Sequence, residues 1–239
     1  MPDAVFLTVA GAAVLFGAVV QSGVGLGLGL VAAPVVAFLD PALVPGTLLI
    51  VTLPLPLLMM GAEWRHIDWR GLAWALPARV PGVVAGAWLV AVLEPRTLGG
   101  VVGAMVLLAV AASLWAPRVP LSPVSLVVAG AASGLSGTAT SIGGPPMALL
   151  YQHETAARVR ATLGGFFLAG TVMSLGALAV GGHLDGAQVR AGLLLMPFVL
   201  AGFGVAGPLR RRLGVSGLRA VLLCLVAVSG SALLVRSLL

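Results

Sequence analysis

Residues 133–147 read SGLSGTATSIGGPPM, and they lie in a run without Asp, Glu, Lys or Arg between Arg118 and Glu154. The stretch combines four glycines and two consecutive prolines with a cluster of hydroxyl side chains. Glycine and proline both interrupt helices. In a bilayer such an interruption is tolerated only where the backbone is buried in protein or lines a polar cavity. The stretch therefore predicts a broken membrane helix beside a functional cavity.

The composition is that of an integral membrane protein. Of the 239 residues, 60% are hydrophobic and 8% are charged, whereas an average soluble domain has about 25% charged residues. The short loops leave no room for a soluble domain, and the length of the apolar runs excludes a membrane β-barrel. We expect an all-α polytopic protein with about 8–10 transmembrane segments, since a span takes about 20 apolar residues. Runs that are uncharged, apart from Arg79, divide the chain: 4–39, 41–62, 71–93, 97–117, 119–153, 161–184, 191–209 and 220–235.

Several function classes lack support in the sequence. All basic residues are arginine, and the net charge of +6 comes without a basic face or an aromatic RNA-binding motif, so we expect no nucleic-acid partner. Cys224 is the single cysteine, which excludes an internal disulfide and a cysteine metal cluster. GFGVAG at 202–207 lies inside an apolar span without a preceding strand, so it does not indicate a dinucleotide site. We predict neither a metal nor a cofactor.

The chain contains an internal repeat. The runs 4–39 and 119–153 are both too long for one span, and each has a glycine-rich interruption followed by proline: QSGVGLGLGLVAAP and SGLSGTATSIGGPP. HID at 66–68 recurs as HLD at 183–185, and Arg70, Pro77 and Gly82 match later residues at one separation of 120 (190 − 70), namely Arg190, Pro197 and Gly202. We predict two transmembrane repeats, 1–117 and 118–239, that form one membrane domain.

The number of crossings in each long run decides the topology. If each run crosses the membrane once, each half has four crossings and the two halves are parallel. If each run forms two short helices, each half has five crossings and the two halves are inverted. The arginines at 210–212 and 219 place that loop in the cytoplasm. With five crossings in each half, five further arginines also lie on the cytoplasmic side, namely Arg65, Arg70, Arg118, Arg158 and Arg160. The inverted arrangement is therefore favoured.

Paired interruptions of this kind are the best indication in a sequence of a transporter site near the bilayer midplane. Freed N–H groups at the start of the half-helix after each break would form an anion site. The alternative is that the glycines only allow helices to pack closely. The predicted substrate-binding residues are Gln21, Ser22, Gly23, Gly25 and Pro34 in the first motif, Ser136, Gly137, Thr138, Thr140, Ser141, Gly143, Gly144, Pro145 and Pro146 in the second, and Arg79.

GAASGLSGTATSIGGPPMALLY at 130–151, followed by RVRATL at 158–163 and preceded by GAVVQSGVGLGLGLVAAPVVAFL at 17–39, resembles the TauE/SafE family of membrane transporters. The resemblance covers essentially the whole chain, and the second motif is the more specific. It implies export or exchange of small anions, such as sulfite, sulfonates and small carboxylates.

Arg79 and a few other charged residues need an explanation. Arg79 lies about midway through an apolar segment, where an unpaired charge is costly. We expect it to contact the substrate anion; the alternatives are that it snorkels to an interface or caps carbonyls freed by nearby prolines. Its counterpart in the other repeat is Val199. Asp68 and Asp185 are predicted helix caps. Arg160 is expected to mark the cytoplasmic side, and the alternative is that it helps to draw anions toward the cytoplasmic mouth.

The sequence thus favours a multi-pass secondary transporter of the bacterial cytoplasmic membrane that exports a small organic or sulfur-containing anion by alternating access between the repeats. It is not expected to be an enzyme. The candidate coupling ion is H+ and the candidate assembly is a homodimer. An anion channel or uniporter is the first alternative, and a membrane-embedded enzyme or assembly factor is the second.

Overall fold

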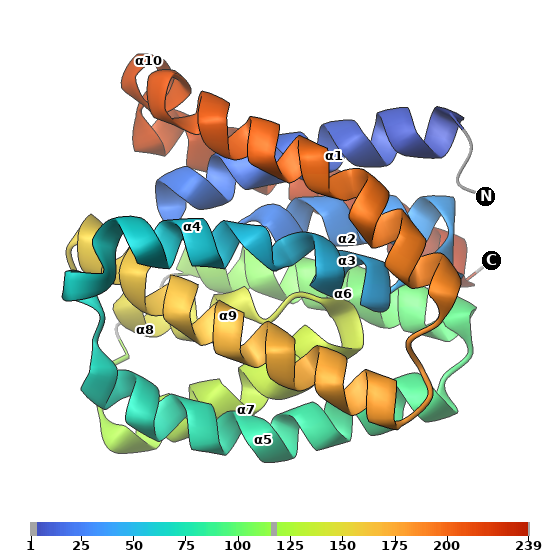
Figure 1. Ribbon diagram of the computed structural model, residues 1–239, viewed down its shortest axis with the longest axis horizontal. Helices are drawn as coiled ribbons and strands as arrows, with labels where there is room; N and C mark the ends of the chain where they lie inside the picture. Colours follow the sequence, from blue (N-terminus) through green and yellow to red (C-terminus); the bar gives the residue numbers. More distant parts are fainter. Residues whose placement is uncertain (1–3, 116–118, 239) are drawn as a thin grey trace.

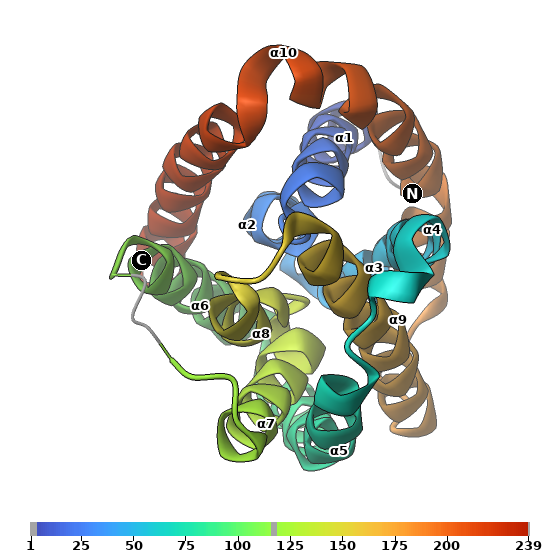
Figure 2. The same cartoon turned by 90° about the vertical axis from the view of Figure 1, so that its left-hand side faces the viewer.

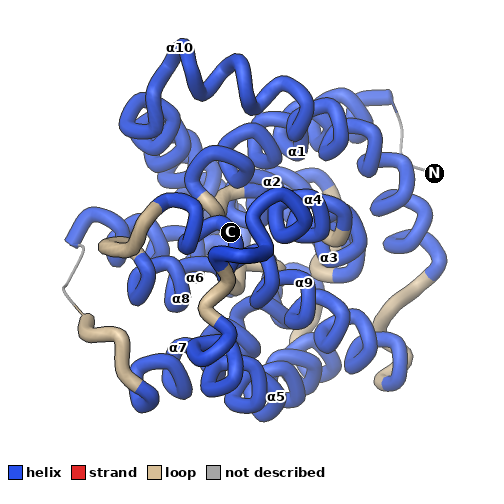
Figure 3. The backbone as a smooth tube through the Cα atoms, turned by 60° about the vertical axis from the view of Figure 1, so that its left-hand side comes forward, coloured by secondary structure: helices blue, strands red, loops and turns tan. Residues whose placement is uncertain are grey.

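The computed structural model describes residues 4–115 and 119–238, and their side chains apart from those at 62, 113, 208–223, 225 and 238. Helices account for nearly all of the described chain, and no strand occurs in it (Figure 3). Five helices or helix arms are long and apolar enough to span a bilayer: Ala4–Val24, Trp69–Val92, Pro95–Ala112, Ala156–Val180 and Gly186–Gly207. The protein is therefore an all-α, multi-pass membrane protein.

The helices of the first half run back and forth along the long axis of the molecule (Figure 1). In chain order they are α1 (Ala4–Val24), α2 (Leu28–Leu39), the short 3₁₀ helix η1 (Pro41–Leu43), α3 (Gly46–Thr52), α4 (Pro54–Glu63), the 3₁₀ helix η2 (Trp64–His66), α5 (Trp69–Val92) and α6 (Pro95–Trp115). The prediction of one segment over 41–62 is refined, since α3 and α4 meet at Leu53, just before the proline that begins α4.

The second half consists of α7 (Pro123–Thr140), α8 (Gly144–Tyr151), α9 (Ala156–Val180) and α10 (Gly186–Leu238). The backbone of α10 is helical over 53 residues, which would extend about 80 Å if straight. It instead arches over α1 and returns along the molecule as a second arm (Figure 2). The arginines at 210–212 and 219 lie in this arch, where the side chains are outside the described residues.

Both long uncharged runs are broken into helical hairpins, as predicted. α1 and α2 are separated by residues 25–27, and α7 and α8 by residues 141–143. Gly25 and Gly27 have positive φ values of 98° and 150°, and Ser141 has a φ of 61°, conformations that L side chains rarely adopt. The two breaks start at a separation of 116 residues (140 − 24). Both halves contain such a break, although this separation differs from the 120 residues of the other matches, and the repeat stays a prediction.

Helices of one half pack closely against helices of the other. α5 lies against α7, and a Cβ added to Gly82 would stand 2.1 Å from the carbonyl oxygen of Ala131. Likewise, a Cβ on Gly130 would stand 2.2 Å from the carbonyl oxygen of Ala75. α10 lies against α1, where a Cβ on Gly202 would stand 2.6 Å from a carbonyl oxygen of α1. Glycines therefore bring the backbones into direct contact, as in other membrane helix pairs.

Two aspartates begin helices in the predicted manner. The Asp68 carboxylate accepts a hydrogen bond of 3.1 Å from the Gly71 N–H at the start of α5. The Asp185 carboxylate accepts one of 2.7 Å from the Gln188 N–H at the start of α10. The HID and HLD sequences thus mark two helix N-termini, because an aspartate at this position satisfies an N–H that the helix leaves without a partner.

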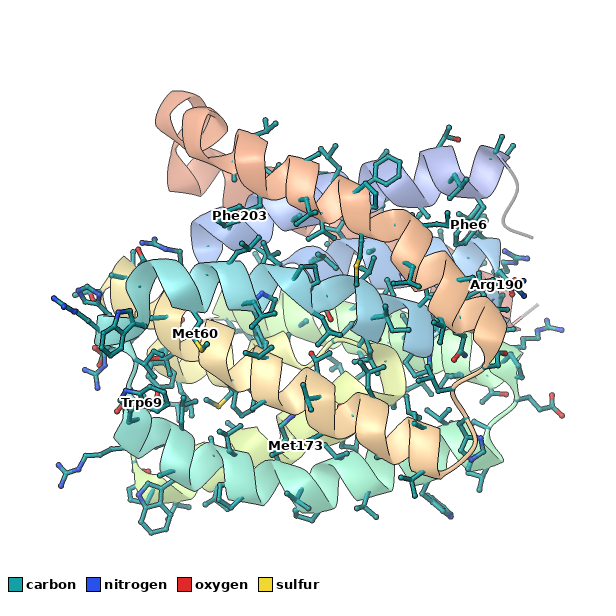
Figure 4. All side chains as sticks on the ribbon, in the orientation of Figure 1. Phe6, Met60, Trp69, Met173, Arg190 and Phe203 are labelled. Atoms are coloured by element: carbon teal, nitrogen blue, oxygen red, sulfur yellow. The ribbon has the colours of Figure 1, made fainter. Side chains whose placement is uncertain are left out.

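Four described arginines gather at one end of the molecule. Arg158 pairs with Asp68, and Arg160 pairs with Glu63, so residues 63–70 and 153–160 lie together. We name this the arginine-rich end; Trp69 lies there in Figure 4, whereas Phe6 and Arg190 lie toward the opposite end. Arg65 and Arg70 fall in the same segment. This placement matches the five-crossing arrangement and disagrees with the four-crossing one.

Candidate anion site between the two hairpins

A small cavity of about 50 Å³ lies where the tips of the two hairpins meet. The α1/α2 hairpin, the α7/α8 hairpin and helices α3, α4, α5 and α9 all contribute to it. Such a volume has room for a few water molecules, which suits a small anion better than a drug-sized ligand. The lining residues are Gln21, Leu26, Gly27, Gly29, Leu30, Leu49, Thr52, Pro56, Arg79, Gly137, Ser141, Ile142, Gly143, Gly144, Phe167 and Thr171.

The hairpin tips touch one another through backbone. A Cβ added to Gly29, in the first turn of α2, would stand 2.3 Å from the carbonyl oxygen of Ser141. Ser141 in turn donates a hydrogen bond of 3.1 Å from its hydroxyl to the carbonyl oxygen of Pro45. Only glycine at position 29 permits this approach, so the two motifs are in contact although they are far apart in the sequence.

The first turn of α2 lies at this cavity. The Gln21 side-chain oxygen accepts a hydrogen bond of 3.0 Å from the Leu28 N–H, the first of α2. Gly29 and Leu30, which follow in the first turn of α2, line the cavity, and the N–H groups of a first helical turn have no partner within the helix. In α8 the prolines at 145 and 146 remove two such donors, and Gly143 and Gly144, just before them, line the cavity on that side.

Arg79 is the charged residue of the cavity. It is 2% exposed, and neither its Nε nor its Nη1 has a hydrogen-bond partner. Its guanidinium carbon lies 4.6 Å from the ring centre of Phe166 on α9, a weak cation–π contact. The burial of the side chain argues against snorkelling, and Nε and Nη1 cap no carbonyl. The contact of Arg79 with a substrate anion stays a prediction.

Space for the Arg79 guanidinium comes from three glycines. A Cβ on Gly170 of α9 would stand 2.1 Å from the guanidinium carbon. On the opposite side, a Cβ on Gly137 would stand 2.9 Å from Nη2, and one on Gly143 would stand 3.5 Å from it. The arginine from the first half therefore reaches into the glycine-rich motif of the second half.

The structure brings six of the predicted site residues together around the cavity: Gln21, Arg79, Gly137, Ser141, Gly143 and Gly144. The others lie around the breaks without lining it: Ser22, Gly23, Gly25, Pro34, Ser136, Thr138, Thr140, Pro145 and Pro146. Gly25, Pro34 and the two prolines of α8 shape the hairpins. Ser22 faces a different cavity, toward the arginine-rich end.

Three hydroxyls of α7 that were predicted to bind substrate, those of Ser136, Thr138 and Thr140, bond to protein groups and do not line the cavity. Ser136 donates to the carbonyl oxygen of Ala132 at 2.9 Å, and Thr140 donates to that of Ser136 at 2.7 Å. Thr138 and Ser174 of α9 share a hydrogen bond of 2.8 Å. Serine and threonine within a helix commonly bond to the carbonyl four residues earlier, and here this local bond occupies two of the hydroxyls.

Several lining residues were not predicted. Leu49, Thr52 and Pro56 come from α3 and α4, and Phe167 and Thr171 come from α9. They stand on apolar helices outside the two glycine-rich breaks. The one sequence feature that could have indicated them is the presence of a polar residue, Thr52 or Thr171, within an apolar run.

At the arginine-rich end, charged groups form a separate network. Arg158 lies 3.0 Å from Asp68 and 3.0 Å from Glu154, and the Tyr151 hydroxyl donates to Asp68 at 3.0 Å. Burial acts to raise the pKa of Asp68, but hydrogen bonds from Gly71, Tyr151 and Arg158 outweigh it, and the pKa lies below its ordinary value. The network ties the start of α5 to the start of α9.

Comparison with known proteins agrees with this architecture. The model of the family described as "Sulfite exporter TauE/SafE" matches residues 9–233, nearly the whole chain, including both hairpins and Arg79. No curated protein matches the chain significantly, and no solved structure does. The chain belongs to the TauE/SafE family of sulfite exporters.

Proposed function

We propose that this protein is a secondary transporter that exports a small sulfur-containing or organic anion, such as sulfite or a sulfonate, through the cavity between the hairpins. The observation that carries the proposal is Arg79: a guanidinium that is 2% exposed, lacks hydrogen-bond partners at Nε and Nη1, and lines a cavity. An unpaired charge at membrane depth is costly and is typically found in functional sites. A bound anion would supply its missing partner.

The chemistry of the lining favours an oxyanion. A guanidinium donates in a planar fork that matches two oxygens of a carboxylate, sulfite or sulfonate. The first turn of α2, at Gly29 and Leu30, adds the positive end of a helix dipole and backbone donors. No Asp or Glu is among the lining residues, so no carboxylate competes for Arg79 there.

Alternating access is the mechanism that this geometry supports best. The two hairpins meet tip to tip at the cavity, and each is held by helices of the other half, as α5 with α7 and α1 with α10. A rocking motion of one bundle, α5 with the α7/α8 hairpin, against the other, α10 with the α1/α2 hairpin, would open the cavity toward one side of the membrane and then the other. Arg79 on α5 would move with the α7/α8 hairpin, because α5 packs directly on α7.

Counterflow in proteoliposomes tests the proposal. Vesicles that contain the purified protein are loaded with unlabelled sulfite and diluted into a trace of radiolabelled sulfite, and then the same assay is run with Arg79→Gln. We expect transient accumulation of label with the parent protein and none with the variant. A carrier gives counterflow because loaded sites exchange across the membrane, whereas a channel only equilibrates the label. Repeating the assay with a sulfonate, a carboxylate and sulfate defines the substrate class, and an imposed pH gradient tests coupling to H+.

A further inference from the structure

A second, larger cavity lies at the arginine-rich end. It has a volume of about 370 Å³, and we name it the chamber. Gly204 and Gly207 of α10 are among its lining residues and are exposed, and a Cβ added to either would meet nothing within 4 Å. The chamber is lined by Ser22 of α1, Met59 and Glu63 of α4, Arg160 of α9, and Phe203, Gly204, Ala206 and Gly207 of α10.

The two charged residues of the chamber are paired with one another. The Arg160 Nε donates to the Glu63 carboxylate at 3.0 Å, and Nη2 donates to the other oxygen of the same carboxylate. Glu63 thus occupies the guanidinium in the two-point geometry that an oxyanion would use. The side chains are 14% and 25% exposed, so the pair faces the chamber from a largely buried position.

The chamber and the central cavity are separated by the tip of the α1/α2 hairpin. Ser22 lines the chamber and its neighbour Gln21 lines the central cavity. Gly25 follows in the break, where an added Cβ would stand 3.3 Å from Val159 and 3.7 Å from the Arg160 Cα. Leu26, the next residue, faces the central cavity. The two cavities are therefore separated by a single turn of the α1/α2 hairpin, which packs against α9 beside Arg160.

We propose that the chamber is an anion vestibule in which Arg160 binds a sulfite- or sulfonate-type oxyanion in place of the Glu63 carboxylate before the anion passes the hairpin tip. This inference rests on the proposed function, which makes the central cavity the site that the anion reaches next. Glu63 acts as a tethered competitor: it satisfies Arg160 when no anion is present, so that the buried guanidinium is not left unpaired. It also repels anions, which keeps the resting vestibule from holding them tightly.

Thiol labelling of the chamber tests the vestibule without any transport assay. Cys224, the only cysteine and an exposed one, is first changed to serine, and Ser22→Cys then places a thiol in the chamber. Membrane vesicles with the arginine-rich end outward are treated with an anionic reagent, sulfonatoethyl methanethiosulfonate, or with a cationic one of similar size that carries trimethylammonium. The measured quantity is the ratio of the anionic to the cationic labelling rate.

We expect Arg160→Gln to lower this ratio about tenfold and Glu63→Gln to raise it by a similar factor, because fixed charges in a cleft change local ion concentrations by that order. Excess methanesulfonate, a sulfonate that does not react with the reagent, should slow labelling by the anionic reagent in the Glu63→Gln variant. The double variant with glutamine at both positions keeps a neutral hydrogen-bonding pair and guards against misfolding; its ratio should lie between those of the two single variants.

Arg158→Gln is the matched control. Arg158 lies two residues away on the same helix and pairs with Asp68 and Glu154, but it does not line the chamber. Its removal should leave the ratio unchanged. Absence of Ser22→Cys labelling from this face, or equal effects of Arg158→Gln and Arg160→Gln, would overturn the vestibule. Charge-dependent labelling in a protein that shows no sulfite counterflow would instead retain the vestibule and reject the proposed substrate.

Discussion

Gly170 of α9 faces the guanidinium of Arg79 so closely that a Cβ added to it would stand 2.1 Å from the guanidinium carbon. Even alanine would therefore displace the arginine from the cavity. We expect Gly170→Ala to reduce sulfite counterflow about as severely as Arg79→Gln, although it removes no charged or polar group. Counterflow at several sulfite concentrations, with protein amounts matched in the vesicles, measures the effect.

Gly176→Ala provides the control for this prediction. It lies on the same helix, and a Cβ there would meet nothing within 4 Å, so counterflow should persist. A Gly170→Ala protein with normal transport would mean that the position of the Arg79 guanidinium is unimportant.

Arg79→Met should separate stability from activity. The substitution replaces an unpartnered buried charge by an apolar side chain of similar length, and replacing buried ionic groups in this way is often neutral or stabilising by about 1–4 kcal/mol. We predict an unchanged or higher melting temperature in detergent without ligand, together with loss of counterflow. A large loss of thermal stability would instead assign Arg79 a structural role.

Contact between the hairpin tips depends on Gly29. A Cβ at this position would stand 2.3 Å from the carbonyl oxygen of Ser141, and backbone at such a distance has to move. Gly29→Ala should cost about 1–3 kcal/mol of stability, as overpacking does, and should impair transport. Gly61→Ala on α4, where a Cβ meets nothing within 4 Å, serves as the control in the same thermal-unfolding and counterflow assays. Equal behaviour of the two variants would argue against tip contact.

Acid should weaken the network around Asp68. The folded-state pKa of this carboxyl lies below its ordinary value of 3.8, so its contribution to stability is complete above that value and is lost as the pH falls through the lower folded-state pKa. Asp68→Asn keeps a helix-capping side chain but cannot pair with Arg158. We expect the variant to be less stable than the parent at neutral pH and to lose less stability below about pH 4. Melting temperatures across this pH range measure both effects, and parallel curves would contradict the prediction.

Much of the hairpin architecture was predictable because glycine, proline and aspartate act locally. The breaks after Val24 and Thr140 follow from runs that are too long for one span, and the caps at Asp68 and Asp185 follow from their positions before apolar segments. Arg79 was identifiable because a charge inside an apolar run needs a partner.

The rest of the site depends on packing that a single sequence does not encode in a recognisable pattern. Phe167 and Thr171 line the cavity because the orientation of α9 turns them toward the hairpins. Leu49 lines it because α3 ends beside the hairpins. The α7 hydroxyls were expected to face an anion, but Ser136 and Thr140 bond to backbone carbonyls of their own helix. A serine or threonine hydroxyl can bond either to a carbonyl of its own helix or to a ligand in the cavity. Which of the two it does depends on its rotamer, which the sequence does not reveal.

Ligand-dependent thermal stability tests the central claim most directly. Melting of the purified protein in detergent is followed as sulfite is titrated, with sulfate and a sulfonate for comparison, and the titrations are repeated on Arg79→Gln. A ligand that binds only the folded protein stabilises it by about 2.7 kcal/mol at one hundred times its dissociation constant. The account predicts that at least one small sulfur oxyanion raises the melting temperature of the parent in a saturable manner and has no effect on Arg79→Gln. Equal, saturable shifts in both proteins would contradict a binding site built around Arg79.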